Sequence, residues 1–140
     1  MDENLIEDRI IELLKEVFDE EHASIIAFPD RPEYEDGVLN WVVRHPLCEI
    51  LVDADDIDYT DSGLVQSDVG IKIEILVFSS QRRGENGIRE ICKTIRHALT
   101  SNIIEGNQLR PTDQRKIMYD GSHWCYGQHY SFDSIYTMGE

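Results

Sequence analysis

The segment GIKIEILVF, residues 70–78, decides the fold of this 140-residue chain. In its first part, isoleucines alternate with charged residues, which is the period-two pattern of a β-strand. Towards its end the second face becomes apolar as well, at Leu76 and Phe78. A strand that is apolar on both faces lies in the interior of a sheet. The segment therefore predicts the central strand of the domain.

Segments on either side of this strand predict two helices and further strands. Apolar residues at helical spacing indicate amphipathic helices over residues 3–20 and 88–99. Short apolar segments indicate strands at residues 23–28 and 47–52. The expected order up to this point is therefore helix, three strands, helix.

Three signals for helix ends and turns complete the predicted order. Asn86 is the expected N-cap of the second helix, and Gly106 is a stop signal beyond its end. Asp120-Gly121 predicts the turn of a hairpin formed by the last two strands. The chain therefore reads α-β-β-β-α-β-β. This order predicts one α+β domain over residues 1–140, with two helices on one face of a mostly antiparallel or mixed sheet.

Composition limits the class of protein. No apolar run approaches the length that spans a bilayer, and the acidic start lacks the cationic region of a signal peptide. The three cysteines show no CxxC spacing, which favours reduced thiols in a cytoplasmic setting. Hydrophobic residues make up 41% and charged residues 29%, so the chain is expected to be globular.

The net charge of −15 is unevenly placed. Residues 1–61 hold 19 acids and 4 Lys/Arg, whereas residues 62–140 hold 9 of each. The whole acidic excess therefore lies in the first part of the chain. Tight binding of free duplex DNA is not expected, because the phosphates would be repelled. Such asymmetry favours either a solvated acidic face or complementary surfaces that meet head-to-tail.

The loop QRRGENG, residues 81–87, lies between a strand and a helix, which is where phosphate-binding loops occur. Gly84 and Gly87 give only a GxxG spacing, and Ile88-Arg89 stand where a Walker motif needs Lys-Ser/Thr. Glu85 also places a carboxylate where phosphate would bind. The loop is therefore interpreted as a strand-to-helix connection, for which a role at an interface stays open.

The segment DADDIDYTDSG, residues 53–63, superficially resembles a calcium-binding loop. An EF-hand needs an acidic or amide ligand at position 5 and Gly at position 6, where this segment has Ile57 and Asp58. Its five aspartates repel one another and it offers little to bury. The sequence therefore predicts a mobile, solvated acidic loop.

The last strand carries two further candidate features. His123, Cys125 and His129 share one face and form a weak candidate metal site without an evident fourth ligand. The other face carries an aromatic stripe that is expected to form a core or a subunit interface, since no basic residues interleave it for base stacking. No catalytic constellation, cofactor site or firm metal site emerges from the residues.

The succession of motifs along the chain resembles the phage Mu-like tail protein family, which is grouped with the tail terminators of long-tailed phages. The segments that carry the resemblance are SIIAFPDRPEYED (24–36), HPLCEILV (45–52), LVQSDVGIKIEILVFSSQRRG (64–84), IREICKTIRHALTSN (88–102) and WCYGQHYSFDSIY (124–136). They cover nearly the whole chain. The length and acidity of residues 53–63, and Cys48-Glu49, depart from the family pattern.

The resemblance implies a structural, non-enzymatic protein of the virion tail, assembled in the cytoplasm of a bacterial host. Tail terminators form hexameric rings that cap the tail tube, stop its polymerisation and present the surface that joins the head. The implied partners are further copies of the chain, the tail-tube protein and a head-completion or connector protein. DNA passes through the ring without being held, and neither a cofactor nor a membrane is implied. The alternatives are another head-completion or neck protein, or a metal-dependent nuclease.

Two groups of residues are candidates for roles in such a ring. The first would form a contact between subunits, and the second would line the passage and repel the phosphates of DNA. The contact candidates are Arg82, Arg83, Glu85, Arg89, Lys93 and Arg96. The acidic candidates are Asp53, Asp55, Asp56, Asp58 and Asp61.

Overall fold

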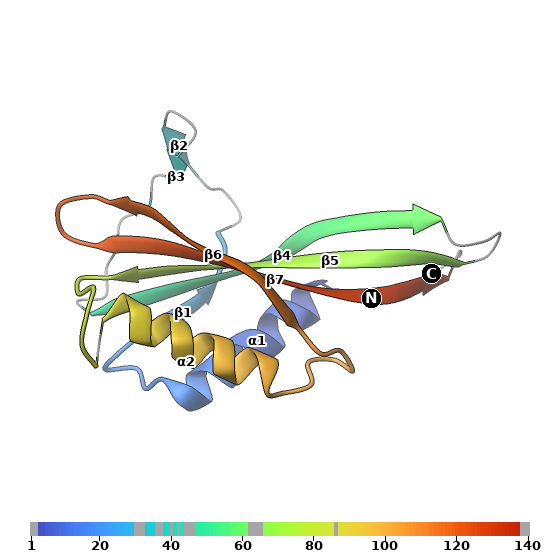
Figure 1. The fold of residues 1–140 in the computed structure, drawn as a ribbon, viewed down its shortest axis with the longest axis horizontal. Coiled ribbons are helices and arrows are strands. Elements are labelled where there is room, and N and C mark those ends of the chain that lie inside the picture. Colours follow the sequence, from blue (N-terminus) through green and yellow to red (C-terminus); the bar gives the residue numbers. More distant parts are fainter. Residues whose placement is uncertain are drawn as a thin grey trace.

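A five-stranded mixed sheet carries both helices on one face (Figure 1). The computed structural model describes residues 3–29, 33–35, 38–39, 41, 43, 47–61, 66–85 and 87–137, without the side chains of 3, 35, 38–39, 55–69 and 133–137. The elements are α1 (Glu3–Val17), β1 (Ser24–Ala27), β2 (Tyr34–Glu35), β3 (Val38–Leu39), β4 (Cys48–Asp61), β5 (Gln66–Ser79), α2 (Ile88–Thr100), β6 (Arg110–Tyr119) and β7 (Trp124–Thr137).

The strand order is β1-β4-β5-β7-β6, with β1 parallel to β4 and all other neighbours antiparallel. This arrangement confirms the α+β class and the mixed sheet. The detailed order differs from the prediction because β2 and β3 form a separate small hairpin. That hairpin lies between the predicted strands at residues 23–28 and 47–52, where the sequence did not predict a strand.

The central position of residues 70–78 is confirmed. β5 is hydrogen-bonded to β4 on one side and to β7 on the other. Ile71, Ile73 and Ile75 are fully buried in the main core, which lies between the sheet and the two helices. Leu76 and Phe78 belong to a second, smaller cluster on the opposite face of the sheet. The strand is therefore buried on both faces in this part.

The prediction of a loop at residues 53–63 is wrong for residues 53–61, which are part of β4. This half of the strand pairs with β5, from Asp56 opposite Lys72 to Asp61 opposite Ser67. Asp53, Asp56, Asp58 and Asp61 occupy ladder positions, so backbone pairing with a neighbouring strand outweighs the low β-propensity of the residue type. Residues 62–65, which include the end of the predicted loop, lie outside the described residues.

A β-bulge interrupts β4 between Asp53 and Asp56, where two residues oppose one on β5. A bulge leaves a backbone group without its ladder partner. Here the amide of Ala54 donates a 2.9 Å hydrogen bond to Oε2 of Glu7, a carboxylate of α1 that is 9% exposed. Helix α1 therefore provides the hydrogen-bond acceptor for the amide at the bulge in β4. This contact fixes the position of the bulge.

Glu7→Leu is expected to lower the free energy of unfolding by about 1–3 kcal/mol, because the buried Ala54 amide loses its acceptor. Glu7→Gln keeps an acceptor oxygen and should cost less. Glu12→Leu, at an exposed position of the same helix, is the control. Chemical denaturation measures all three variants, and equal losses for Glu7→Leu and Glu12→Leu would contradict this role.

The helix termini differ from the sequence predictions in two places. Helix α1 ends at Val17 rather than near residue 20. The N-cap of α2 is Gly87, which makes no side-chain capping bond, so the assignment of Asn86 is wrong. Gly106 adopts φ +77° in a turn after the helix, consistent with its predicted role as a stop signal.

Strand β6 forms an edge of the sheet and is irregular. It pairs only with β7, and its register shifts twice, between Pro111 and Asp113 and between Lys116 and Met118. The turn that joins it to β7 is the predicted one: Gly121 has φ +97°, and the amide of Asp120 donates to the carbonyl of His123. The hairpin is therefore confirmed.

Candidate interaction surface

Amides at the N-terminus of α2 donate hydrogen bonds to carbonyls of the loop between β5 and α2. The amide of Ile88 donates to the carbonyl of Gln81 at 2.8 Å, and the amide of Gly87 donates to the carbonyl of Gly84 at 3.1 Å. Gly84 has φ +94°, and a Cβ on Gly87 would lie 2.5 Å from the backbone of Arg83. Both glycines are therefore required by the turn, and the amide of Ile88, the first residue of α2, already has an acceptor.

Arg82 is held by its own domain. Its guanidinium lies over the ring of Trp124, 5.6 Å from the centroid, and the ammonium of Lys116 lies at 6.0 Å from the same ring. Tyr119 stacks on Trp124 with a centroid distance of 4.5 Å. The sequence showed no basic residue interleaved with the aromatic stripe, because these two cations come from another loop and another strand. A cation in this position stabilises the hairpin end of the sheet.

The remaining contact candidates are exposed. Arg83 and Glu85 lie in the loop, and three cations follow one another along α2: Arg89, Lys93 and Arg96. Lys93 also approaches Glu90 at 3.7 Å, a surface pair one turn apart that contributes little to stability. The structure thus separates Arg82 from the other candidates and brings together those on α2.

An open groove runs between α2 and the beginning of β6. One part is lined by Lys93, Arg96, His97, Thr100 and Pro111. It continues past Arg96 and Pro111 along β6 to Gln114, where the buried Gln128 and Tyr130 form part of its wall. The groove is therefore basic along the helix, while along the strand its lining is uncharged except for Asp113.

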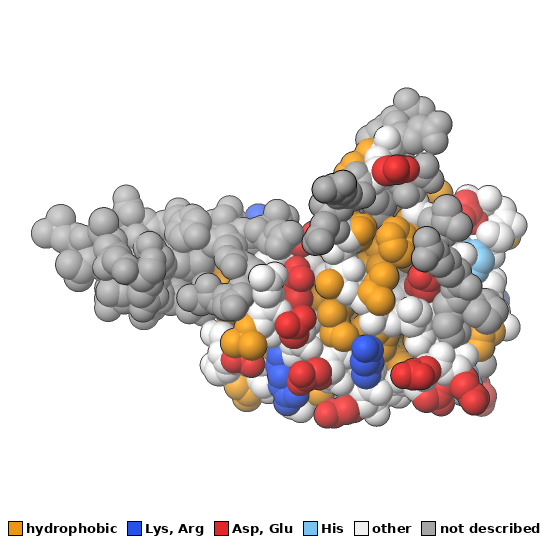
Figure 2. Space-filling view, turned by 180° about the vertical axis from the view of Figure 1, so that it is seen from behind, with side chains coloured by type: hydrophobic (Ala, Val, Ile, Leu, Met, Phe, Trp, Pro, Cys, Tyr) orange, Lys and Arg blue, Asp and Glu red, His pale blue; other side chains and the backbone are white. Residues whose placement is uncertain are grey.

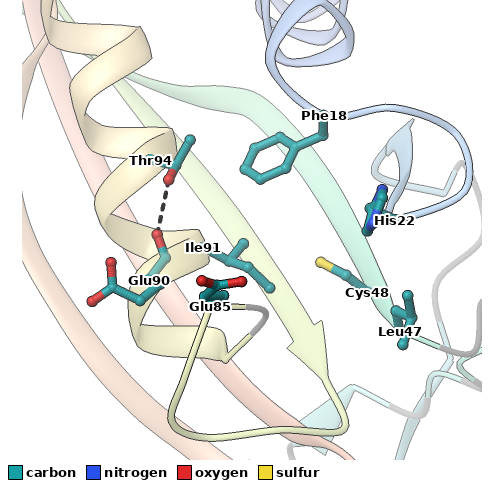
Figure 3. A pocket seen from close by; sticks show the side chains of 8 residues that line it. All are labelled: Phe18, His22, Leu47, Cys48, Glu85, Glu90, Ile91 and Thr94. Atoms are coloured by element: carbon teal, nitrogen blue, oxygen red, sulfur yellow. Dashed lines mark hydrogen bonds between the residues drawn. The ribbon is translucent and has the colours of Figure 1, made fainter.

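A small pocket lies on the other side of α2 (Figure 3). Its apolar wall comes from Phe18, Leu47 and Ile91, and Cys48 points into it beside His22. Burial raises the pKa of the Cys48 thiol to about 12, so the sulfur is a neutral thiol near pH 7 and a poor nucleophile. The complete lining is Phe18, His22, Leu47, Cys48, Glu85, Glu90, Ile91 and Thr94.

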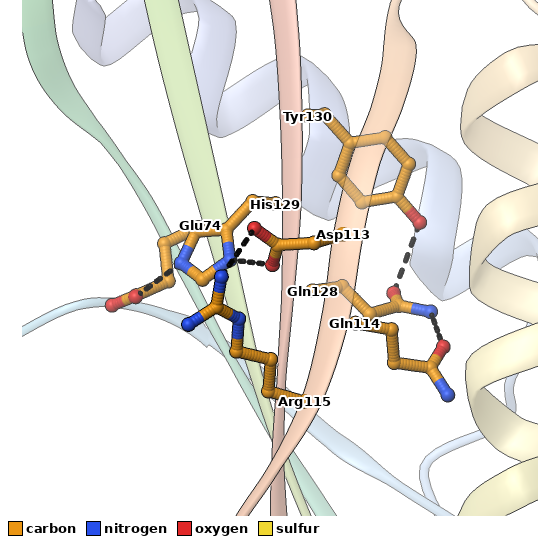
Figure 4. A network of polar contacts seen from close by, with 7 residues as sticks. All are labelled: Glu74, Asp113, Gln114, Arg115, Gln128, His129 and Tyr130. Carbon is orange, nitrogen blue, oxygen red and sulfur yellow. Dashed lines mark hydrogen bonds and ion pairs between the residues drawn. The ribbon is translucent and has the colours of Figure 1, made fainter.

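His123, Cys125 and His129 do not form a common site. His123 lies in the hairpin turn beside Ser122, and Cys125 is buried in the second core cluster. His129 binds Asp113 through Nδ1 and Glu74 through Nε2, at 2.5 and 2.8 Å (Figure 4). Within the described side chains, no three His, Cys, Asp or Glu residues are arranged to hold a metal ion.

The three-residue bridge of Glu74, His129 and Asp113 joins β5, β7 and β6 on the sheet face opposite the helices. Partial burial alone would lower the pKa of His129, but the hydrogen bonds to Asp113 and Glu74 raise it overall. The bond from His129 in turn lowers the pKa of Asp113. No single stretch of sequence indicates this bridge, because its members lie on three separate strands.

We expect the charged bridge to make the stability of the protein pH-dependent. Its contribution is complete below the usual pKa of 6.5 for histidine and is lost as pH rises through the raised pKa of folded His129. The melting temperature of wild type should therefore fall towards that of His129→Asn as pH rises above 6.5. His97→Asn, at an exposed position of α2, is the control. A difference between wild type and His129→Asn that does not change with pH would contradict a charged bridge.

On the helix side of the sheet, the buried Gln128 joins three elements (Figure 4). Its Nε2 donates to the carbonyl of Cys92 in α2 at 2.8 Å. The same Nε2 donates to Oε1 of Gln114 in β6 at 3.0 Å. Its Oε1 accepts from the hydroxyl of Tyr130 at 3.0 Å. This network fixes α2, and with it the basic helix face, on the sheet. The role of Gln128 was not predicted, because in the sequence it is only one polar residue within the aromatic stripe.

The acidic candidates lie along the second half of β4. Asp53 is partly buried beside the bulge. The positions of Asp55, Asp56, Asp58 and Asp61 are fixed by the strand, although their side chains are outside the described ones. With β5 and β7, this half of β4 forms a ribbon that runs past the ends of both helices (Figure 1).

A search among known proteins finds no protein-family model and no curated protein that matches the chain. No helix among the described residues is both long and apolar enough to cross a membrane.

Proposed function

We propose that the chain is a structural subunit of a phage or prophage tail, of the terminator type, that forms a ring on the end of the tail tube. The order of motifs along nearly the whole sequence, which resembles that of Mu-like tail proteins, supports this proposal. The fold is compatible with this proposal, because a domain whose two lateral surfaces differ can form the head-to-tail contacts of a ring. The ring, a hexamer on the tail, stops polymerisation of the tube protein and offers a surface to a head-completion or connector protein.

The observation that carries the proposal is the three-stranded ribbon beyond the helices (Figure 1). The ribbon includes Asp56, Asp58 and Asp61 on β4, and Asp68 on β5 adds a further acid. Several such ribbons directed towards the axis of a ring would surround a passage with negative charge. DNA then passes through without being held, because its phosphates are repelled at every subunit.

The proposal also defines where the protein acts and what it needs. It belongs to the virion tail and is assembled in the cytoplasm of the bacterial host. Its role is mechanical, so it requires no cofactor and catalyses no reaction. The cations of α2 and the loop, apart from Arg82, supply the basic part of the contact between subunits.

The test first looks for a tail-tube gene in the same genome, then co-produces its product with the chain and examines the tubes by electron microscopy. With the wild-type chain we expect tubes of defined length that carry a ring at one end, and without it tubes that continue to grow. A variant with Asp56→Ala, Asp58→Ala and Asp61→Ala should still cap tubes, because the acids are assigned to the passage. Tubes of unchanged length with bare ends in the presence of the folded chain would refute the proposal.

A further inference from the structure

The two helices divide the molecule into two lateral sides. Helix α1 packs on β1 and β4, at one edge of the sheet, whereas α2 packs on β5, β6 and β7, towards the other. The outer side of α1 with β1 and the outer side of α2 with β6 therefore face away from each other. We call them the α1 side and the α2 side. Copies placed side by side in one orientation would bring the α2 side of one against the α1 side of the next.

The charges of these two sides are opposite. Residues 3–22, which contain α1 and the turn after it, hold eight acids and two Lys/Arg, a balance of −6. Residues 88–119, which contain α2 and β6, hold three acids and six Lys/Arg, a balance of +3. Like sides would repel in a two-fold contact, while unlike sides attract in a head-to-tail contact.

The exposed charges form matching rows. Asp8, Glu12 and Glu16 are spaced by four residues on α1 and are all exposed, so they lie along one helix face over about 12 Å. On α2 the exposed cations recur after four and three residues, at positions 89, 93 and 96, over about 10 Å. Two of these cations line the groove between α2 and β6. Rows of similar length allow several charges to pair in one register.

Each side also exposes apolar side chains that could supply affinity. On the α1 side, Leu5 is 50% and Ile26 is 37% exposed, and at the hairpin end of β6, Tyr119 is 52% exposed. Seen from behind, hydrophobic side chains gather around β1, with acidic side chains beside them (Figure 2). Apolar contacts of this kind contribute most of the free energy of association, and charge sets register and specificity.

We infer that the groove between α2 and β6 is a docking site for the acidic face of α1 of a second copy of this chain. The contact is heterologous, so each copy uses its α2 side towards one neighbour and its α1 side towards the other. This inference rests on the proposed ring and identifies the surfaces that build it. Arg82 is not part of this contact, because its guanidinium lies over the ring of Trp124. The ribbon of β4, β5 and β7 also lies outside the contact, so it can line the passage.

Zero-length carbodiimide cross-linking of a mixture of unlabelled and ¹⁵N-labelled wild-type protein tests the contact directly. The reagent joins a lysine amine to a carboxylate that it touches, and mixed-isotope peptides report contacts between copies. We expect mixed peptides that join Lys93 to Glu12 or Glu16. Lys72, exposed on the sheet face away from the helices, is the internal control. If Lys93 joins only Glu90 of its own chain, the inference is wrong.

Charge reversal gives a second test with a built-in control for folding. Arg89→Glu/Arg96→Glu reverses two of the three cations of α2 but keeps the amine of Lys93 for cross-linking, and Glu12→Lys/Glu16→Lys makes the face of α1 basic. Each variant alone should show about tenfold fewer helix-to-helix cross-links than wild type. A mixture of the two should recover them, since the reversed α2 of one copy then meets the reversed α1 of the other. Lys72→Glu, which makes the net charge more negative but leaves both sides intact, should behave as wild type. A mixture without recovery would refute the docking.

The tests separate this inference from the proposed function. Cross-links between α1 and α2 in a protein that does not cap tail tubes would support the contact and refute the role in the tail. Capped tubes without such cross-links would support the role and refute the docking. Neither result depends on the other.

Discussion

Ile75→Asp is expected to abolish folding. Ile75 is fully buried in the main core, on a strand bonded to neighbours on both sides. An unpaired carboxylate in such a place costs several kcal/mol, either as a desolvated charge or as a protonated group at neutral pH. A domain of this size has a total stability of about 5–15 kcal/mol. Loss of the cooperative thermal transition, seen by circular dichroism, is the expected measurement.

The matched control is Ile103→Asp, the same substitution at a side chain that is 61% exposed after α2. It should melt cooperatively within about 0.5 kcal/mol of wild type. A soluble Ile75→Asp variant that melts as wild type does would show that β5 is not the centre of the sheet.

Gln128→Leu should be the second most damaging change, with a loss of about 3–5 kcal/mol in the free energy of unfolding. The substitution keeps the volume but leaves the hydroxyl of the buried Tyr130 without its acceptor. It also removes the donor that ties Cys92 in α2 and Gln114 in β6 to β7. Gln108→Leu, at an exposed loop position, controls for the gain in hydrophobicity. Similar losses for the two variants in urea denaturation would contradict the network.

Gln128→Glu tests the same network through the pH dependence of the variant's stability. A buried carboxyl group that faces two acceptor oxygens, those of Cys92 and Gln114, has a pKa raised above its unfolded value of about 4.3. The folded variant then holds a proton that the unfolded chain releases, so stability falls as pH rises above about 4.3. We expect the variant to approach wild type near pH 4 and to differ most near pH 8. A constant difference would mean that the position is solvated.

The parts of the fold that sequence predicted are those with a strong local pattern. Residues 70–78 alternate and then become apolar on both faces, and the second helix repeats its apolar residues at helical spacing, so both elements were found. Residues 53–61 have no such pattern, and their aspartates indicate a loop. Their strand depends on pairing with β5, which residue preference does not reveal.

The candidate surface was predictable only in outline. The cations of α2 share one helix face, so spacing alone identified them. The contact of Arg82 with the ring of Trp124 was not predictable, because Trp124 lies 42 positions further along the chain. The same holds for His129, which sequence grouped with its neighbours His123 and Cys125, while its real partners come from two other strands.

The irregular edge of β6 has a consequence for how copies of the chain can meet in solution. An unpaired edge strand normally offers a row of amides and carbonyls on which any other strand can grow. Pro111 lacks an amide hydrogen, two register shifts break the row, and Arg115 and Lys116 place charges along it. The edge is therefore a poor template for amyloid-like growth. At this edge, one copy of the chain should therefore not extend the sheet of another.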